Sequence, residues 1–225
     1  MHLIKLLKTW GFGILLGIFA SVFLYEKGGA TIVTGLHYLS LVPQSQNPFV
    51  SIFFKNSLAS LTIVFLGLLL CVLELGIYKN VSSPTYSFLE RLTEPLYGVL
   101  SLLFPIFDDM RPFFRSCYFY LVFVPYFSML VNGAVFGFLL GHYYIGEMAT
   151  DYLVGLFPHA LVEIPAMFAS AVLALLILDG VRNQIISGEV PGLENALKVE
   201  VKRAVLPAAL VQVLLFIAAF LESCT

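Results

Sequence analysis

The stretch NSLASLTIVFLGLLLCVLELGI, residues 56–77, contains a single charged side chain, Glu74. At 1.5 Å per residue these residues form a helix of about 33 Å, enough to cross the ~30 Å hydrocarbon core of a bilayer. The rest of the chain agrees, because 60% of its 225 residues are hydrophobic, 12% are charged and its mean hydropathy is +0.94. This composition excludes an ordinary soluble domain and predicts an integral membrane protein.

Four further stretches are long and apolar enough to span a membrane. The expected spans of one transmembrane domain, residues 1–225, are 9–25, 56–77, 113–141, 152–178 and 204–221. None shows the alternation of a membrane β-barrel, so we predict an all-α bundle of about five transmembrane helices with kinked, Gly-rich packing. The third span contains Pro125 and the pair Asn132-Gly133, and forms either one bent helix or a hairpin. A hairpin would leave only about 12 Å after the turn, too little to span.

The N-terminal segment and the connection after the second span need separate comment. Residues 1–25 resemble a signal peptide, but no small-x-small cleavage site follows the apolar run, so we expect an N-terminal anchor. Residues 84–107 place apolar side chains largely on one side and charged ones opposite. This pattern predicts an interfacial amphipathic helix on the inner membrane surface.

The distribution of Lys and Arg predicts the orientation. With five spans and a cytoplasmic N-terminus, the inside segments hold most of the basic residues, namely Lys5, Lys8, Lys79, Arg91, Arg111, Arg115, Arg182, Lys198, Lys202 and Arg203. The outside segments hold Lys27 and Lys55. Short cytoplasmic loops carry such an excess of positive charge. We therefore expect a multi-pass protein of the cell membrane with a cytoplasmic N-terminus and an extracytoplasmic C-terminus.

Charge and cysteine usage limit the partners. A net charge of −2 gives no basis for nucleic-acid binding. Cys71, Cys117 and Cys224 form no C-x-x-C motif, which argues against a structural disulfide or a cysteine metal site. We predict no cofactor, and expect the partners to be the lipid bilayer and other membrane or cell-envelope proteins.

The stretch LFPHALVEIPAMFA, residues 156–169, places His159 and Glu163 four residues apart between two prolines. Residues i and i+4 share a helix face, and an ionisable side chain at hydrocarbon depth costs about 2.5–3.5 kcal/mol, so the pair should face the bundle interior. Pro158 and Pro165 each free the carbonyl four residues back. The stretch therefore predicts a kinked, polar pocket.

Other polar residues are expected at a similar depth. The helical rise places six candidates for a ligand, ion or proton site in the outer half of the membrane: Asn56, Asn132, His142, His159, Glu163 and Glu222. A purely structural interpretation of the His159–Glu163 pair is that it forms an interhelical hydrogen bond with Asn132 or Asn56. Glu74 and Asp179 fall near the inner ends of their spans, where a charged side chain can extend to the lipid headgroups, so their presence needs no functional explanation.

Glycines recur every fourth residue in the third span, at Gly133, Gly137 and Gly141. Such a stripe lets helix backbones approach closely. We assign packing roles to these glycines and to Pro165, and expect the third and fourth helices to pack through the stripe and bring Asn132 against Glu163. The stripe is equally compatible with a homo-oligomer.

Four segments resemble the stage II sporulation protein M family of integral membrane proteins. They are KNSLASLTIVFLGLL from Lys55, NGAVFGFLLG from Asn132, FPHALVEIPAMFASA from Phe157 and AAFLES from Ala218. The resemblance assigns the family pattern to Asn56, Asn132, Gly133, Gly137, His159, Glu163, Pro165 and Glu222. The family more usually has glycine at Ala160 and often a second asparagine at Ser57. The resemblance implies a membrane protein that, in spore formers, acts as the membrane-embedded member of a peptidoglycan-remodelling machine.

Three functions fit these observations. The first is a non-enzymatic scaffold or assembly subunit whose polar cluster fixes helix register. The second is a channel, transporter or transporter subunit that uses His159 and Glu163 as an ion or proton site. The third and least supported is an intramembrane metal-dependent hydrolase, for which His142 or Glu222 would have to complete a set of about three zinc ligands. Five spans without an evident inverted repeat favour the scaffold.

Overall fold

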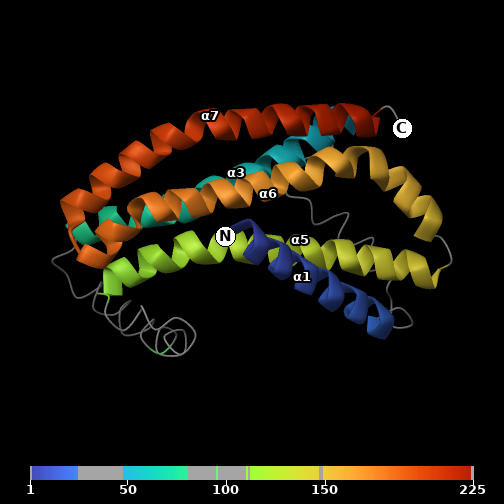
Figure 1. Cartoon of the computed structure of the whole chain (residues 1–225), viewed down its shortest axis with the longest axis horizontal. Coiled ribbons are helices and arrows are strands. Elements are labelled where there is room, and N and C mark those ends of the chain that lie inside the picture. Colours follow the sequence, from blue (N-terminus) through green and yellow to red (C-terminus); the bar gives the residue numbers. More distant parts are fainter. Residues whose placement is uncertain are drawn as a thin grey trace.

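The computed structural model shows five long helices in its described part (Figure 1). Residues 2–24, 48–80, 95, 110, 112–146 and 149–223 are described, without the side chains of residues 48, 80, 112 and 149–159. The helices are α1 (His2–Leu24), α3 (Pro48–Asn80), α5 (Pro112–Ile145), α6 (Ala149–Ser187) and α7 (Val190–Ser223). All five are long and apolar enough to cross a membrane, and the described residues contain no strand. The predicted all-α bundle is confirmed, and this is a multi-pass membrane protein.

The predicted spans lie within longer helices, apart from Tyr25, which is outside the described residues. The third span is a single helix and not a hairpin, because α5 runs unbroken through Pro125 and the Asn132-Gly133 pair. The helices α3, α5, α6 and α7 have 33, 34, 39 and 34 residues. At 1.5 Å per residue they are about 50–59 Å long, well beyond the ~30 Å hydrocarbon core. The interfacial helix expected at 84–107 lies, except for Pro95, outside the described residues.

The bundle has two distinct ends. At the α5–α6 end, α5 finishes and α6 begins; at the α6–α7 end, α6 turns into α7 (Figure 1). The α6–α7 turn uses Gly188, whose φ of 71° lies in the left-handed region that favours glycine. Its N–H donates to the carbonyl of Gln184 at 3.2 Å, which closes the last turn of α6.

Packing at the α6–α7 end is dense and its surface is charged. Large buried side chains gather there from α5, α6 and α7, including Phe113, Phe114, Val181, Ile185, Leu193 and Leu197. Glu194 pairs with Lys79 of α3 and with Lys198 at 2.9 Å. Because α7 is longer than the hydrocarbon core is thick, this charged first part of α7 lies outside the core, ahead of the apolar residues 204–221.

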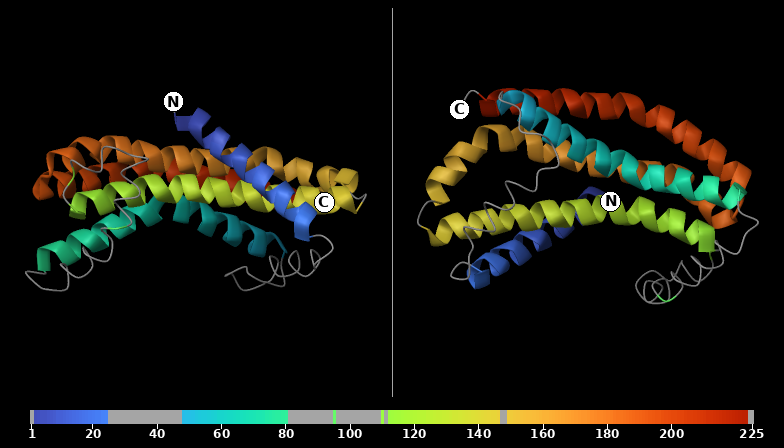
Figure 2. Two further views of the ribbon diagram at one scale, coloured as in Figure 1. Left: turned by 90° about the horizontal axis from the view of Figure 1, so that it is seen from below. Right: turned by 180° about the vertical axis from the view of Figure 1, so that it is seen from behind.

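The glycine stripe of α5 packs against α1. The contact uses small residues on both helices, namely Gly13, Gly17 and Ser21 of α1 and Gly133, Gly137 and Gly141 of α5. A Cβ atom at Gly137 would collide with the backbone of Ile14, so the two backbones touch. Figure 2 (left) shows α1 crossing α5 along this seam. The expectation that the third and fourth helices pack through the stripe is therefore wrong.

The small residues of α6 face other helices. Ala166 packs with Val211 and Leu215 of α7, and Ser170 contacts Ser60 of α3. Glycine spacing on α1 matches that of α5, so α1 fits the stripe, whereas the small face of α6 is already covered. Pro165 is exposed, and the packing role expected of it stays a prediction.

Candidate functional site

Glu163 lies on α6, fourteen residues after the first residue of that helix. The first part of α6, near the α5–α6 end, is bent (Figure 1). Pro158 and Pro165 supply the cause, because each lacks the N–H that would bond the carbonyl four residues back. The side-chain amide of Asn56 on α3 donates a hydrogen bond to the Glu163 carboxylate. Glu222 on α7 lies near enough for its charge to repel that carboxylate. Three of the six predicted residues, from three helices, therefore meet.

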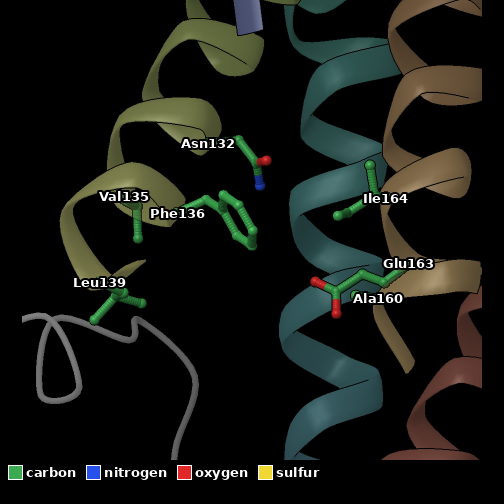
Figure 3. Close-up of a pocket in the computed structure, with 7 residues that line it drawn as sticks. All are labelled: Asn132, Val135, Phe136, Leu139, Ala160, Glu163 and Ile164. Atoms are coloured by element: carbon green, nitrogen blue, oxygen red, sulfur yellow. The ribbon is translucent and has the colours of Figure 1, made fainter. Parts of the chain in front are cut away.

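A cavity of about 160 Å³ lies between α5 and α6 (Figure 3). Its walls are Asn132, Val135, Phe136, Leu139, Ala160, Glu163 and Ile164. Figure 3 shows Asn132 and Phe136 on the α5 side and Glu163 opposite them on α6. One carboxylate and one amide thus project into otherwise apolar surroundings. Asn132 does lie across from Glu163, although the glycine stripe is not what brings them together.

Trp10 of α1 orients Asn132. Its Nε1 donates to Oδ1 of Asn132 at 3.0 Å. Because an indole N–H can only donate, the amide oxygen must face it and the Asn132 Nδ2 group remains a donor directed elsewhere. Trp10 also packs against Phe136 and Phe168, with ring centroids 5.7 and 5.6 Å apart. Trp10 was not among the predicted site residues, since a tryptophan in a span is common near the membrane interfaces.

The two predicted histidines have different outcomes. His159 is on the helical backbone of α6, but its side chain is outside the described residues. The ring of His142 lies parallel to Phe138, with centroids 6.4 Å apart, and is not part of the cavity wall. Within the described ranges, no three His, Cys, Asp or Glu side chains are placed to bind a metal together.

A second group of polar side chains, which was not predicted, joins α3, α6 and α7. Gln212 Nε2 donates to Ser60 Oγ at 3.2 Å, and Ser60 Oγ lies 2.8 Å from Ser170 Oγ. Ser170 in turn donates to the carbonyl of Ala166 at 2.9 Å, so Ser60 supplies the proton between the two hydroxyls. The position of Ser60 could have indicated this group, because Ser60 follows Asn56 by one turn on the same helix face.

Glu74 and Asp179, which were expected near the inner ends of their spans, have partners within the chain. The hydroxyls of Tyr120 and Ser116 on α5 donate to the Glu74 carboxylate. Asp179 Oδ2 lies 2.7 Å from Nε2 of His2, which ties the start of α1 to α6. Both contacts join helices, like those around Glu163.

The profile of the Stage II sporulation protein M family matches residues 113–225, just over half of the chain. The chain belongs to this family. The resemblance found in its sequence is thereby confirmed. The part that matches the stage II sporulation protein M profile contains α5, α6 and α7, and with them Asn132, Glu163 and Glu222. Trp10 and Asn56, the hydrogen-bond partners of Asn132 and Glu163, lie before the matched residues. No curated protein and no solved structure matches the chain.

Proposed function

We propose that this member of the stage II sporulation protein M family is a non-enzymatic assembly subunit, a rigid membrane bundle that positions partner proteins of the membrane or cell envelope. The observation that carries the proposal is the pairing of polar side chains between helices: Asn56 with Glu163, Trp10 with Asn132, and Gln212 with Ser60 and Ser170. At membrane depth such hydrogen bonds fix which helices touch and in which register.

An apolar layer on α3 supports assembly over transport. Ser60 and Cys71 lie on one face of α3, eleven residues or about 16 Å apart. Between them, Ile63, Val64 and Leu68 are only 6%, 2% and 6% exposed. An ion or proton does not cross such a distance through dry apolar packing without water or polar groups. The polar groups on either side of the layer then act as separate helix contacts.

A flux assay tests the proposal. Purified protein in liposomes that contain a pH-sensitive or ion-sensitive dye is expected to give no flux above that of empty liposomes. The variants Glu163→Gln and His159→Ala are expected to change thermal stability only. A flux that the wild-type protein supports and Glu163→Gln abolishes would overturn the assembly function.

The second candidate is an ion or proton site, favoured by the proximity of Glu222 to Glu163. Two carboxylates in a medium of low dielectric constant repel each other, and a shared proton or cation relieves the repulsion. The same flux assay separates the two functions, because a cation held as structural glue does not cross the bilayer.

A further inference from the structure

We propose that a cluster of three lysines at the α6–α7 end binds the phosphate of an anionic phospholipid. The lysine cluster consists of Lys79 at the end of α3 and of Lys198 and Lys202 on α7. This inference goes beyond the proposed function, because it holds for an assembly subunit and for a transporter alike. Three observations carry it: the net charge of the cluster, its level in the membrane and the apolar face of α7 that continues from it.

The lysine cluster carries more positive charge than its one carboxylate neutralises. Lys79 and Lys198 both pair with Glu194, so two cations share one anion. Lys202 is exposed and forms no ion pair with any residue in the described part of the chain. No Asp or Glu lies three or four residues from it, where an ion pair along the helix would form. Three lysines and one carboxylate leave a net charge of +2 at neutral pH.

The two lysines of α7 repel each other unless an anion lies between them. Lys198 and Lys202 are one turn apart on the same side of the helix, and like charges at this spacing are unfavourable. A phosphate offers several acceptor oxygens, and ammonium groups on flexible stems bind it as point charges. A phosphate near both lysines therefore replaces a repulsion by two attractions.

The lysine cluster lies at the level of the lipid headgroups. Residues 204–221 contain no charged side chain, and as a helix they are about 27 Å long, close to the ~30 Å of the hydrocarbon core. Arg203 precedes this apolar run and Glu222 follows it, so the run itself fixes both boundaries of the core. Lys202 stands directly before it. Its ammonium group thus extends into the layer that contains the phosphates.

The side of α7 that carries Lys202 continues into exposed apolar side chains. At 3.6 residues per turn, Leu206 and Val213 lie within about 40° of Lys202 around the helix axis. They are 69% and 56% exposed. This side therefore presents cations at headgroup level and an apolar surface along the core, which is the order of head and acyl chain in a phospholipid. A soluble anion would contact the cations alone, so the arrangement selects a lipid with an anionic head.

Native mass spectrometry tests the proposal. The full-length protein in neutral detergent is titrated with phosphatidylglycerol or with phosphatidylcholine of the same acyl chains, so that only the charge of the headgroup differs. We expect phosphatidylglycerol to bind about tenfold more tightly, as the attraction of several lysines for an anionic lipid allows. Equal binding of the two lipids overturns the proposal.

Variants locate the binding site. Lys202→Gln is expected to lower the affinity for phosphatidylglycerol about fivefold, and Lys202→Arg to retain it. Arg203→Gln is the matched control, because it removes one positive charge from the adjacent residue, which already pairs with Glu200 at 2.7 Å. It should leave the affinity intact. An affinity that is unchanged in Lys202→Gln, or that falls equally in Arg203→Gln, overturns the proposal. Both positions are exposed, so neither substitution should disturb the fold, which circular dichroism verifies.

A soluble competitor separates a lipid from other anions. Glycerophosphoglycerol is the headgroup of phosphatidylglycerol without acyl chains, and we expect an excess of it to leave the bound lipid in place. Displacement would show that the site takes soluble anions, and would overturn the proposal. None of these results bears on the proposed assembly function, whose own test is the absence of Glu163-dependent flux.

Discussion

The side chain of Asn56 on α3 donates to the carboxylate of Glu163 on α6. The bond joins two helices whose residues are far apart in the sequence, at the end of the bundle where α7 brings a second carboxylate. Because a carboxylate at this depth has lost most of its water, its remaining donors determine how well the three helices hold together.

Removing that donor should weaken the bundle. The variant Asn56→Ala leaves the Glu163 carboxylate without the amide, and we expect a loss of about 1–2 kcal/mol in the free energy of unfolding. Denaturation in detergent, followed by circular dichroism, measures it. If Asn56→Ala were as stable as the wild type, the bond between Asn56 and Glu163 would contribute nothing to the free energy of unfolding.

The neighbouring Ser57 supplies a matched control. Its Oγ is buried and accepts or donates no hydrogen bond within the described part of the chain. A buried hydroxyl without a partner costs free energy, so Ser57→Ala should leave stability unchanged or raise it slightly. If Ser57→Ala lowered the free energy of unfolding as much as Asn56→Ala, the loss in Asn56→Ala could not be assigned to its hydrogen bond.

The seam between α1 and α5 should not tolerate side chains. In Gly137→Leu, the new atoms would collide with the backbone of Ile14, and we expect α1 to separate from α5 with a loss of at least about 1–3 kcal/mol. Cysteine crosslinking between the two helices would fall with it. Gly11→Ala, on the open side of α1, is the control, because a Cβ atom there meets nothing within 4 Å. Equal crosslinking in both variants would contradict the packing.

Fluorescence should report the bond between Trp10 and Asn132. Asn132→Leu removes the acceptor of the indole N–H, and we expect the emission of Trp10 to shift to shorter wavelength as its surroundings become apolar. The control is Val131→Leu at the adjacent exposed position, which should leave the spectrum unchanged. An unaltered spectrum in Asn132→Leu would place the indole donor on another acceptor.

Acid should weaken the charged α6–α7 end. Lys79 and Lys198 lower the pKa of Glu194 from 4.5 to about 2. Because the folded-state pKa is the lower one, the ion pairs contribute stability above the unfolded value, and this is lost as the pH falls from about 4.5 through about 2. The difference in Tm between wild type and Glu194→Gln should shrink over that window, and in high salt at neutral pH. A difference that is constant with pH would rule out the linkage.

The class of the protein and the contents of its spans follow from the amino-acid sequence. Apolar length requires five membrane helices, and it excludes a hairpin within 113–141 because too few residues remain after Asn132-Gly133. The helical rise likewise places Asn56, Glu163 and Glu222 at similar depth without reference to any neighbouring helix. These properties depend only on one helix at a time, through its length and its repeat of 3.6 residues.

Which helices meet is a property of the packed bundle and not of any single helix. A stripe of glycines fixes a flat face on α5 but not its partner, since lipid offers no hydrophobic force that distinguishes α1 from α6. The partners of Ser60, Trp10 and Glu74 could not be predicted for the same reason. The sequence shows that a polar side chain in a span needs a hydrogen-bond partner, but which residue provides it depends on how the separate helices rotate and cross.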